Sequence, residues 1–191
     1  MTLQSFNHRF GVRGVALAAS LACAAATGQA FAATPTQGTL GATSTGVITI
    51  TASVPNRARI TGLTDVGFLN QDPNSAASSA QDVCVWSNTA TKGYTITASG
   101  NGGGSAFTLS NGTTTVPYSV EWAATSGQTS GSTLTAGTAS GSLVSTAVNQ
   151  TCSSAPAASA TLLVKMSTTD LGTMTAGSNY AGTLTLVVTP Q

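Results

Sequence analysis

Carboxylates and thiols are the side chains that could do chemistry here, because the chain's single histidine, His8, lies in an N-terminal segment that we expect to be removed. Without histidine, a Ser-His-Asp triad, a Cys-His pair and the usual zinc sites cannot be assembled. Paired carboxylates could still hydrolyse a glycosidic bond. The five carboxylates lie apart in the sequence, and nothing in their spacing brings two together: Asp65, Asp72, Asp82, Glu121 and Asp170. The sequence therefore predicts no enzyme and no catalytic residue.

A possible metal loop is the stretch NQDPN, residues 70–74, which offers several oxygen atoms. It lacks the alternating ligands and the distal glutamate of a calcium loop. A turn with Asp before Pro explains it more simply. We expect neither a metal nor a cofactor.

Two cysteines, Cys84 and Cys152, follow the N-terminal segment. In an exported chain, a lone pair most simply forms one disulfide, because the compartment is oxidising. Two separate buried thiols are the alternative. Neither reading makes them catalytic, since no CxxC spacing or nearby histidine lowers a thiol pKa.

Residues 1–32 have the order of a secretory signal peptide. Arg9 and Arg13 precede an uncharged Ala/Leu run, and the small residues Ala30 and Ala32 precede the expected cleavage site. A membrane anchor is a weaker reading, because the run over residues 14–26 is short and about 20 strongly apolar residues are needed to span a bilayer. A lipoprotein modified at Cys23 is weaker too, because the nearest leucine is one place too close. We expect export, with no membrane insertion after cleavage.

The exported part carries few charges. Only 6% of the chain is charged, and after cleavage the net charge is about −1. Such a surface has no positive electrostatic potential to attract phosphates, so nucleic acid and anionic membranes are poor partners. The basic residues that remain are Arg57, Arg59, Lys92 and Lys165.

Almost every ordered-looking segment has the period of a strand. Short runs rich in Val, Ile, Thr and Tyr are separated by turn chemistry, with Asn-Gly at residues 101–102 and 111–112. Residues 74–82 are the one candidate for a helical turn, and a loop is equally compatible with them. The pattern predicts an all-β, two-sheet sandwich of about seven to nine strands. We expect the aromatic residues Trp86, Tyr118 and Trp122 to lie in its core, with Trp86 on the face of Cys84.

The exported part reads as one domain. Residues 33–45 contain Pro, Gly and Thr and little to bury, so they predict a flexible tail. Residues 46–191 predict the sandwich domain, with residues 126–141 as flexible hairpin surface and residues 152–160 as a loop.

Apolar strands are predicted at both ends of this domain, and the first has no neighbouring hairpin partner. Such a chain either pairs the two strands within one molecule or shares one between molecules. At residues 46–54 the alternating side chains are Ile48, Ile50, Ala52 and Val54, and at residues 183–189 they are Leu184, Leu186 and Val188.

Several stretches resemble the subunits of archaic chaperone-usher pili and the related spore coat protein U family. They are the leader, then TGVITITASV, VCVWSNTATKGYTITASG with its cysteine, VPYSVEW with a central tyrosine, and the closing GSNYAGTLTLVV. The resemblance spans most of residues 43–190.

The resemblance implies an immunoglobulin-like sandwich that lacks one strand. In such proteins a periplasmic chaperone fills the groove, and the N-terminal strand of the next subunit then replaces it. Carried onto this chain, the donor strand is residues 46–54, with Ile48, Ile50, Ala52 and Val54 filling pockets. The acceptor groove is walled by Leu184, Leu186 and Val188. The implied partners are identical or homologous subunits, a periplasmic chaperone and an outer-membrane usher, and the implied location is the cell-surface fimbrium.

Two features depart from that family. Its members often carry a cysteine soon after the donor strand, where this chain has VPNRARI, so Cys84 would pair with the late Cys152. The C-terminus also lacks the penultimate aromatic residue of classical pilins. A self-contained secreted sandwich that binds carbohydrate or protein remains the alternative.

Overall fold

The computed structural model describes residues 34–191, which divide into a segment ending at Ala52 and the unit Ser53–Gln191. The predicted signal peptide lies outside the described residues. In the first segment, Thr36 and Val47 exchange backbone hydrogen bonds of 3.0 and 2.9 Å. Residues 46–54 have no strand assignment, because Val47 alone among them has a bridging partner in the described part. Their alternation predicts a strand, but a strand also needs a continuous hydrogen-bonded neighbour.

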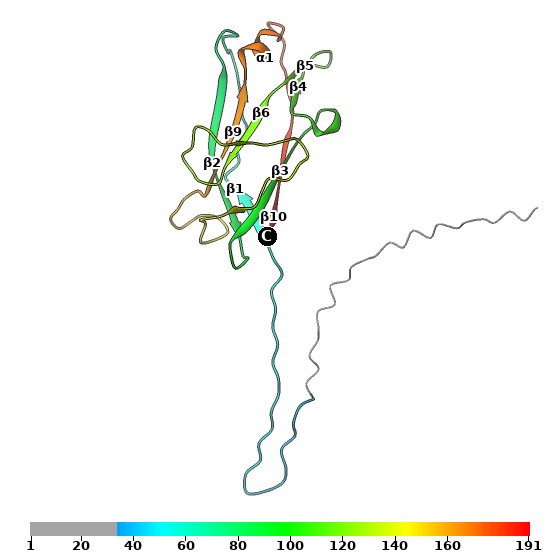
Figure 1. Ribbon diagram of the computed structural model, residues 1–191, viewed down its shortest axis with the longest axis vertical. Coiled ribbons are helices and arrows are strands. Elements are labelled where there is room, and N and C mark those ends of the chain that lie inside the picture. The colour runs from blue at the N-terminus through cyan, green and yellow to red at the C-terminus, as the bar shows by residue number, and fades with distance from the viewer. Residues whose placement is uncertain (1–33) are drawn as a thin grey trace, which may run out of the picture. The chain divides into compact units, whose positions relative to one another are not determined.

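The unit Ser53–Gln191 is built from antiparallel sheets (Figure 1). The five-stranded sheet has the order β1 (Ala58–Thr61), β2 (Ala77–Ser87), β9 (Ala160–Met166), β6 (Ser119–Ala123) and β7 (Ser132–Thr133). The three-stranded sheet has the order β10 (Leu184–Pro190), β3 (Gly93–Gly100) and β8 (Leu143–Val144), and β4 (Thr108–Ser110) pairs with β5 (Thr115–Pro117). The predicted all-β, two-sheet sandwich is confirmed. More strands are described than expected, because four of them are only two or three residues long.

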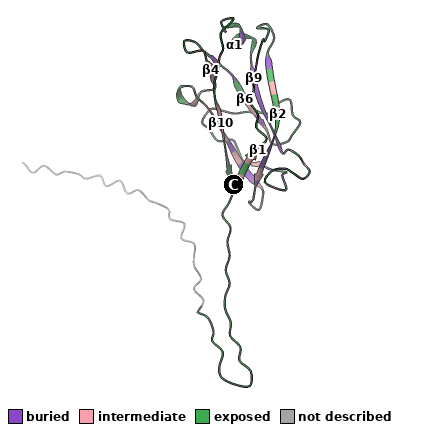
Figure 2. Cartoon of the chain, turned by 180° about the vertical axis from the view of Figure 1, so that it is seen from behind, coloured by how far each residue is buried: buried purple, intermediate pink, exposed green. Residues whose placement is uncertain are grey.

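The core lies between the two larger sheets (Figure 2). Val85 and Val120 from the five-stranded sheet and Ile96 from the three-stranded sheet are fully buried. Trp122 donates from Nε1 to the hydroxyl of the buried Tyr94 at 3.1 Å, so both aromatic polar groups have a partner. The predicted core positions Tyr118 and Trp122 are buried.

Residues 74–82 form neither the helical turn nor the loop that the sequence allows. A turn ends at Ser75, whose backbone N donates to Asp72 O at 3.0 Å, and β2 begins at Ala77. The alternation of buried Ala77 with exposed Ser78 suits a strand, and pairing with β9 supplies the partner that the sequence could not name.

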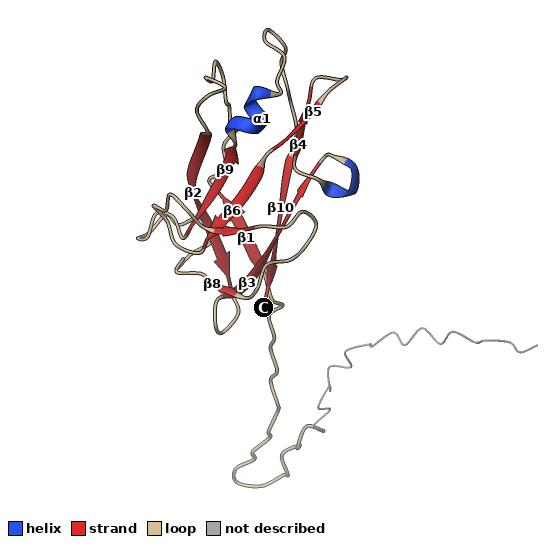
Figure 3. Cartoon of the chain, turned by 45° about the horizontal axis from the view of Figure 1, so that its top comes forward, coloured by secondary structure: helices blue, strands red, loops and turns tan. Residues whose placement is uncertain are grey.

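Within residues 34–191, helical structure is confined to two short elements (Figure 3): η1 (Gly103–Ser105) and α1 (Thr168–Gly172). Ser167 caps α1 by accepting from the backbone N of Asp170 at 3.1 Å. Among the described residues, no helix has the length and apolar character needed to cross a membrane.

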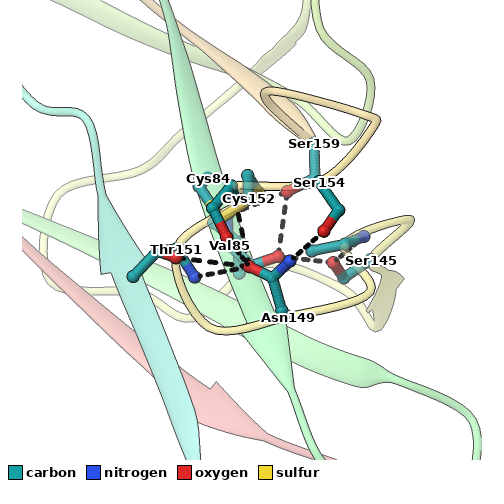
Figure 4. Close-up of a disulfide and its surroundings, with 10 residues drawn as sticks. Cys84, Val85, Ser145, Asn149, Thr151, Cys152, Ser154 and Ser159 are labelled. Atoms are coloured by element: carbon teal, nitrogen blue, oxygen red, sulfur yellow. Dashed lines mark hydrogen bonds between the residues drawn. A yellow bond between two sulfur atoms is a disulfide. The ribbon is translucent and has the colours of Figure 1, made fainter.

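Cys84 and Cys152 form a disulfide, as predicted, with Cα atoms 5.8 Å apart and a sequence separation of 68 (Figure 4). Both cysteines are buried, and half-buried Trp86 packs against them with Ala147. This small cluster lies on the opposite face of β2 from Val83 and Val85, because successive side chains of a strand alternate. Trp86 therefore shares the face of Cys84 as predicted, but it lies outside the main core.

The disulfide holds a loop that completes the hydrogen bonding of β2. The β9 pairing ends at Val83, where Ser159 N donates to Val83 O at 2.9 Å. Beyond it, Ser159 Oγ accepts from Val85 N at 2.8 Å, and Val85 O accepts from the hydroxyls of Ser159 and Ser145. Hydroxyls therefore replace the missing strand neighbour.

Replacing both Cys84 and Cys152 by Ser is expected to lower the free energy of unfolding by about 2–5 kcal/mol, because the long loop is no longer closed in the unfolded chain. Denaturant unfolding without reductant measures the difference. Val148→Ser, at an exposed position of the same loop, is the control and should change stability by less than about 0.5 kcal/mol. Equal stability of the double variant and the parent would contradict this role.

An ion pair joins neighbouring strands of the five-stranded sheet. Lys165 Nζ donates to Glu121 Oε2 at 2.7 Å, and Gly131 N donates to the same oxygen at 3.0 Å. The hydrogen bond from Lys165 is the main reason why the pKa of Glu121 lies below its ordinary value. A carboxylate with a lowered pKa in the folded chain stabilises the fold above the unfolded pKa and loses that effect as the pH falls.

Glu121→Gln is therefore expected to lower stability at pH 7 and to have a smaller effect as the pH falls below about 4, the ordinary range of a glutamate. Denaturant unfolding of both chains at a series of pH values measures this. A difference that stays constant from pH 7 to pH 3 would contradict a stabilising ion pair.

Candidate functional site

A cleft of about 1410 Å³ opens along one side of the unit Ser53–Gln191. One wall is formed by residues 63–71, which follow β1, and the other by β10 and the residues before it. The floor is apolar and comes from the five-stranded sheet, with Leu162, Val164 and Met166 of β9. Leu171 and Met174, at and after α1, line it as well.

The β10 wall is an edge strand. In the described chain β3 is the strand that is hydrogen-bonded to it, paired from Leu184 with Gly100 to Pro190 with Tyr94. Leu184, Leu186 and Val188 point toward the core but are only half-buried, while the residues between them are exposed. The apolar face of β10 is thus incompletely covered. The edge of β10 that faces away from β3 has no hydrogen-bonded strand beside it in the described chain.

The wall of residues 63–71 also lacks backbone hydrogen bonds to a neighbouring strand. These residues have no strand assignment and make no backbone-to-backbone hydrogen bond within the described part. Gln81 holds Thr64 instead, by accepting from Thr64 N at 2.8 Å and donating to Thr64 O at 3.2 Å. Val66 and Phe68 are half-buried against the core, so the segment has the alternation of a strand without a neighbour.

The cleft offers little acid or base chemistry. The ionisable side chains that line it are Asp65, Tyr118 and Tyr180. Burial raises the pKa of Tyr118, and a hydrogen bond from Thr175 N at 3.1 Å lowers the pKa of Tyr180. Across residues 34–191, no three His, Cys, Asp or Glu side chains come together as metal ligands. Apolar side chains and open backbone edges suit an extended apolar peptide segment.

The structure places the sequence-predicted site residues as follows. Leu184 and Leu186 line the cleft, whereas Val188 lies on the same face of β10 but outside the lining. In the predicted donor segment, Ile48, Ile50 and Val54 are 71%, 84% and 83% exposed, and Ala52 is exposed too. Apolar side chains this exposed have a free energy to gain from burial.

Sequence reasoning missed the wall of residues 63–71. Its signal is brief, since only Val66 and Phe68 alternate with polar or small neighbours before the NQDPN turn. Met174 and Tyr180 were missed as well, because they lie in irregular backbone between α1 and β10.

The chain matches no protein-family model and no curated protein. Among solved structures, it is similar to a chaperone-tip adhesin complex described as vital for synergistic activation of CFA/I fimbriae biogenesis, with 19% identity and a TM-score of 0.48 over 70% of this chain and 41% of that chain. It is also similar to the CsuC-CsuE chaperone-tip adhesion subunit pre-assembly complex of the archaic chaperone-usher Csu pili of Acinetobacter baumannii, with 18% identity and a TM-score of 0.38 over 71% and 40%. This chain therefore spans about two fifths of the length of the solved chains it matches.

Hydrogen exchange of the free chain tests the open edges. Backbone amides of residues 66–70 are expected to exchange nearly as fast as an unfolded peptide, because no backbone acceptor holds them. Amides of β9, which lies between β2 and β6, should exchange at least about 10³-fold more slowly, because they open only when the whole fold opens. Protection of residues 66–70 equal to that of β9 would mean that the cleft wall is already paired.

Proposed function

We propose that this chain is an exported structural subunit, a pilin, of a surface fibre, and that it polymerises by donor-strand complementation. The observation that carries this proposal is a cleft between two unpaired backbone edges, the edge of β10 that faces away from β3 and the segment 63–71. One inserted strand could pair with β10 on one side and with residues 63–71 on the other. It would also cover the half-buried face of β10.

The donor is residues 46–54 of another copy. Their backbone is free of strand pairing apart from Val47, and Ile48, Ile50, Ala52 and Val54 are exposed at alternate positions. Burying three or four such side chains contributes roughly 1–3 kcal/mol each, before the cost of association. Main-chain hydrogen bonds on both sides add to the affinity.

Before polymerisation, an open apolar cleft is an aggregation hazard. We propose that a strand of a periplasmic chaperone covers it first, and that an outer-membrane usher is where the donor segment replaces that strand. The role needs no catalytic group, metal or cofactor.

The donor segment supplies the experiment and its own matched control. Ile48→Asp with Ile50→Asp should abolish polymerisation, because two carboxylates would have to enter an apolar cleft. Thr49→Asp with Thr51→Asp adds the same charge to the opposite face of the segment, and this variant should still polymerise. Light scattering after size-exclusion chromatography and electron microscopy of fibres give the readout.

Two results would contradict the proposal. If the Ile48/Ile50 variant still polymerises and only the stability of the monomer falls, the segment pairs within its own fold, as in the self-contained sandwich. If both variants polymerise equally, the alternating face of residues 46–54 is not recognised at all.

A further inference from the structure

Three basic side chains gather at one end of the unit Ser53–Gln191. Beside β1, Asn88 N donates to Arg57 O at 3.1 Å and Arg57 N donates to Asn88 Oδ1 at 2.6 Å, and Arg59 lies opposite Trp86 near the end of β2. Lys92 directly precedes β3, whose first residue, Gly93, accepts from the backbone N of Gln191. Figure 1 shows β1, the beginning of β3 and the end of β10 together at this end. None of the three side chains has an acidic partner within the described residues, where the one ion pair is Lys165 with Glu121.

The opposite end carries acidic side chains. Asp72 lies in the turn before β2, and Asp170 lies in α1, directly after β9. Since Ala77 at the start of β2 pairs with Met166 at the end of β9, both carboxylates lie beyond the same ends of these two strands. Asp72 accepts from Asn74 and Asp170 from Ser167, and neither has a cationic partner in the described part. Asp65 and Asp82 lie between the ends.

We propose that the basic end of one copy, formed by Arg57, Arg59 and Lys92, docks on the acidic end of the next copy, formed by Asp72 and Asp170. This inference rests on the proposed function, because a fibre repeats one contact between opposite ends of identical copies. Three positive and two negative side chains then face each other at every junction.

Chain direction links the charged ends to the cleft. β10 runs toward the basic end, where its last residue, Pro190, pairs with Tyr94. A donor strand antiparallel to β10 therefore runs from the basic to the acidic end of the acceptor and leaves it there. From Val54, Arg57 is only three residues away, a span of at most about 10 Å. The donor's basic end must then sit beside the acceptor's acidic end.

Parallel insertion would have the opposite result. The chain would leave the cleft beside Lys92, so the basic ends of two copies would face each other with like charges. Main-chain pairing alone permits either direction. The segregated charges thus favour the antiparallel one, by attraction in one arrangement and repulsion in the other.

The contact should act on assembly rate and direction more than on affinity. Exposed ion pairs contribute little net stability, but complementary potentials steer encounters and suppress wrong orientations. Their range is about 8 Å at physiological ionic strength and about 3 Å at 1 M salt. The low charge of the rest of the chain leaves these two ends as the main electrostatic features.

Charge reversal tests the docking directly. Arg57→Glu with Arg59→Glu makes both ends acidic, and Asp72→Lys with Asp170→Lys makes both ends basic. Each full chain alone should assemble at least about 10-fold more slowly than the parent at low salt, because like charges meet at each junction. Mixing the two variants should restore the rate, since each end then meets an opposite one. The differences should largely vanish near 1 M salt.

A charge-matched control separates the basic end from net charge. Arg57→Gln with Arg59→Gln lowers the net charge by two, and so does Thr129→Glu with Ser130→Glu in an exposed loop. Only the first pair should slow assembly. Thermal unfolding of each variant identifies any loss of folded protein, which neither pair should cause, because none of these side chains makes a hydrogen bond in the described structure.

The outcomes separate this inference from the proposed function. If the reversed chains assemble like the parent while the Ile48/Ile50 variant stays monomeric, donor-strand assembly holds and charged docking is wrong. If mixing fails to restore the rate of two slow but folded variants, the ends do not meet each other, and their partner is another protein. A parent chain that never polymerises overturns both.

Discussion

The open edge of β10 is the constraint on which the rest of this structure depends. A strand with one neighbour leaves a row of backbone donors and acceptors unpaired, and proteins usually blunt such edges with charges, bulges or covering loops. The sequence of β10 contains no charged residue, and a strand-like segment without backbone partners lies across the cleft. The edge is therefore open to pairing, and the apolar face of β10 is incompletely covered.

Elsewhere in the fold, side chains satisfy polar groups that have no strand neighbour. Where β9 ends, Ser159 and Ser145 satisfy the backbone of Val85, and the disulfide fixes the loop that carries them. Trp122 and Tyr94 satisfy each other within the core. At the cleft no side chain of residues 34–191 does this for the open edge of β10, and one inserted strand would satisfy both walls.

The sequence predicts most of the sandwich because its signals are local. Period-two alternation indicates the longer strands, and two cysteines in an exported chain indicate one disulfide. The cleft wall of residues 63–71 and the early start of β2 were not predicted, because both depend on long-range neighbours. Residues 46–54 show the same dependence on long-range neighbours, because their alternation predicts that they can pair as a strand but not with which strand.

Backbone pairing explains why a strand could enter the cleft, but it does not fix the direction of that strand. Hydrogen-bond ladders form in both directions, and an alternating apolar segment presents a similar row of side chains when reversed. Direction needs an asymmetric feature outside the ladder. The chain has few charges, yet its unpaired cations lie near the attachment point of residues 46–54 and two of its acids lie at the far end of the cleft. A low overall charge therefore strengthens the directional signal, because little else on the surface competes with it.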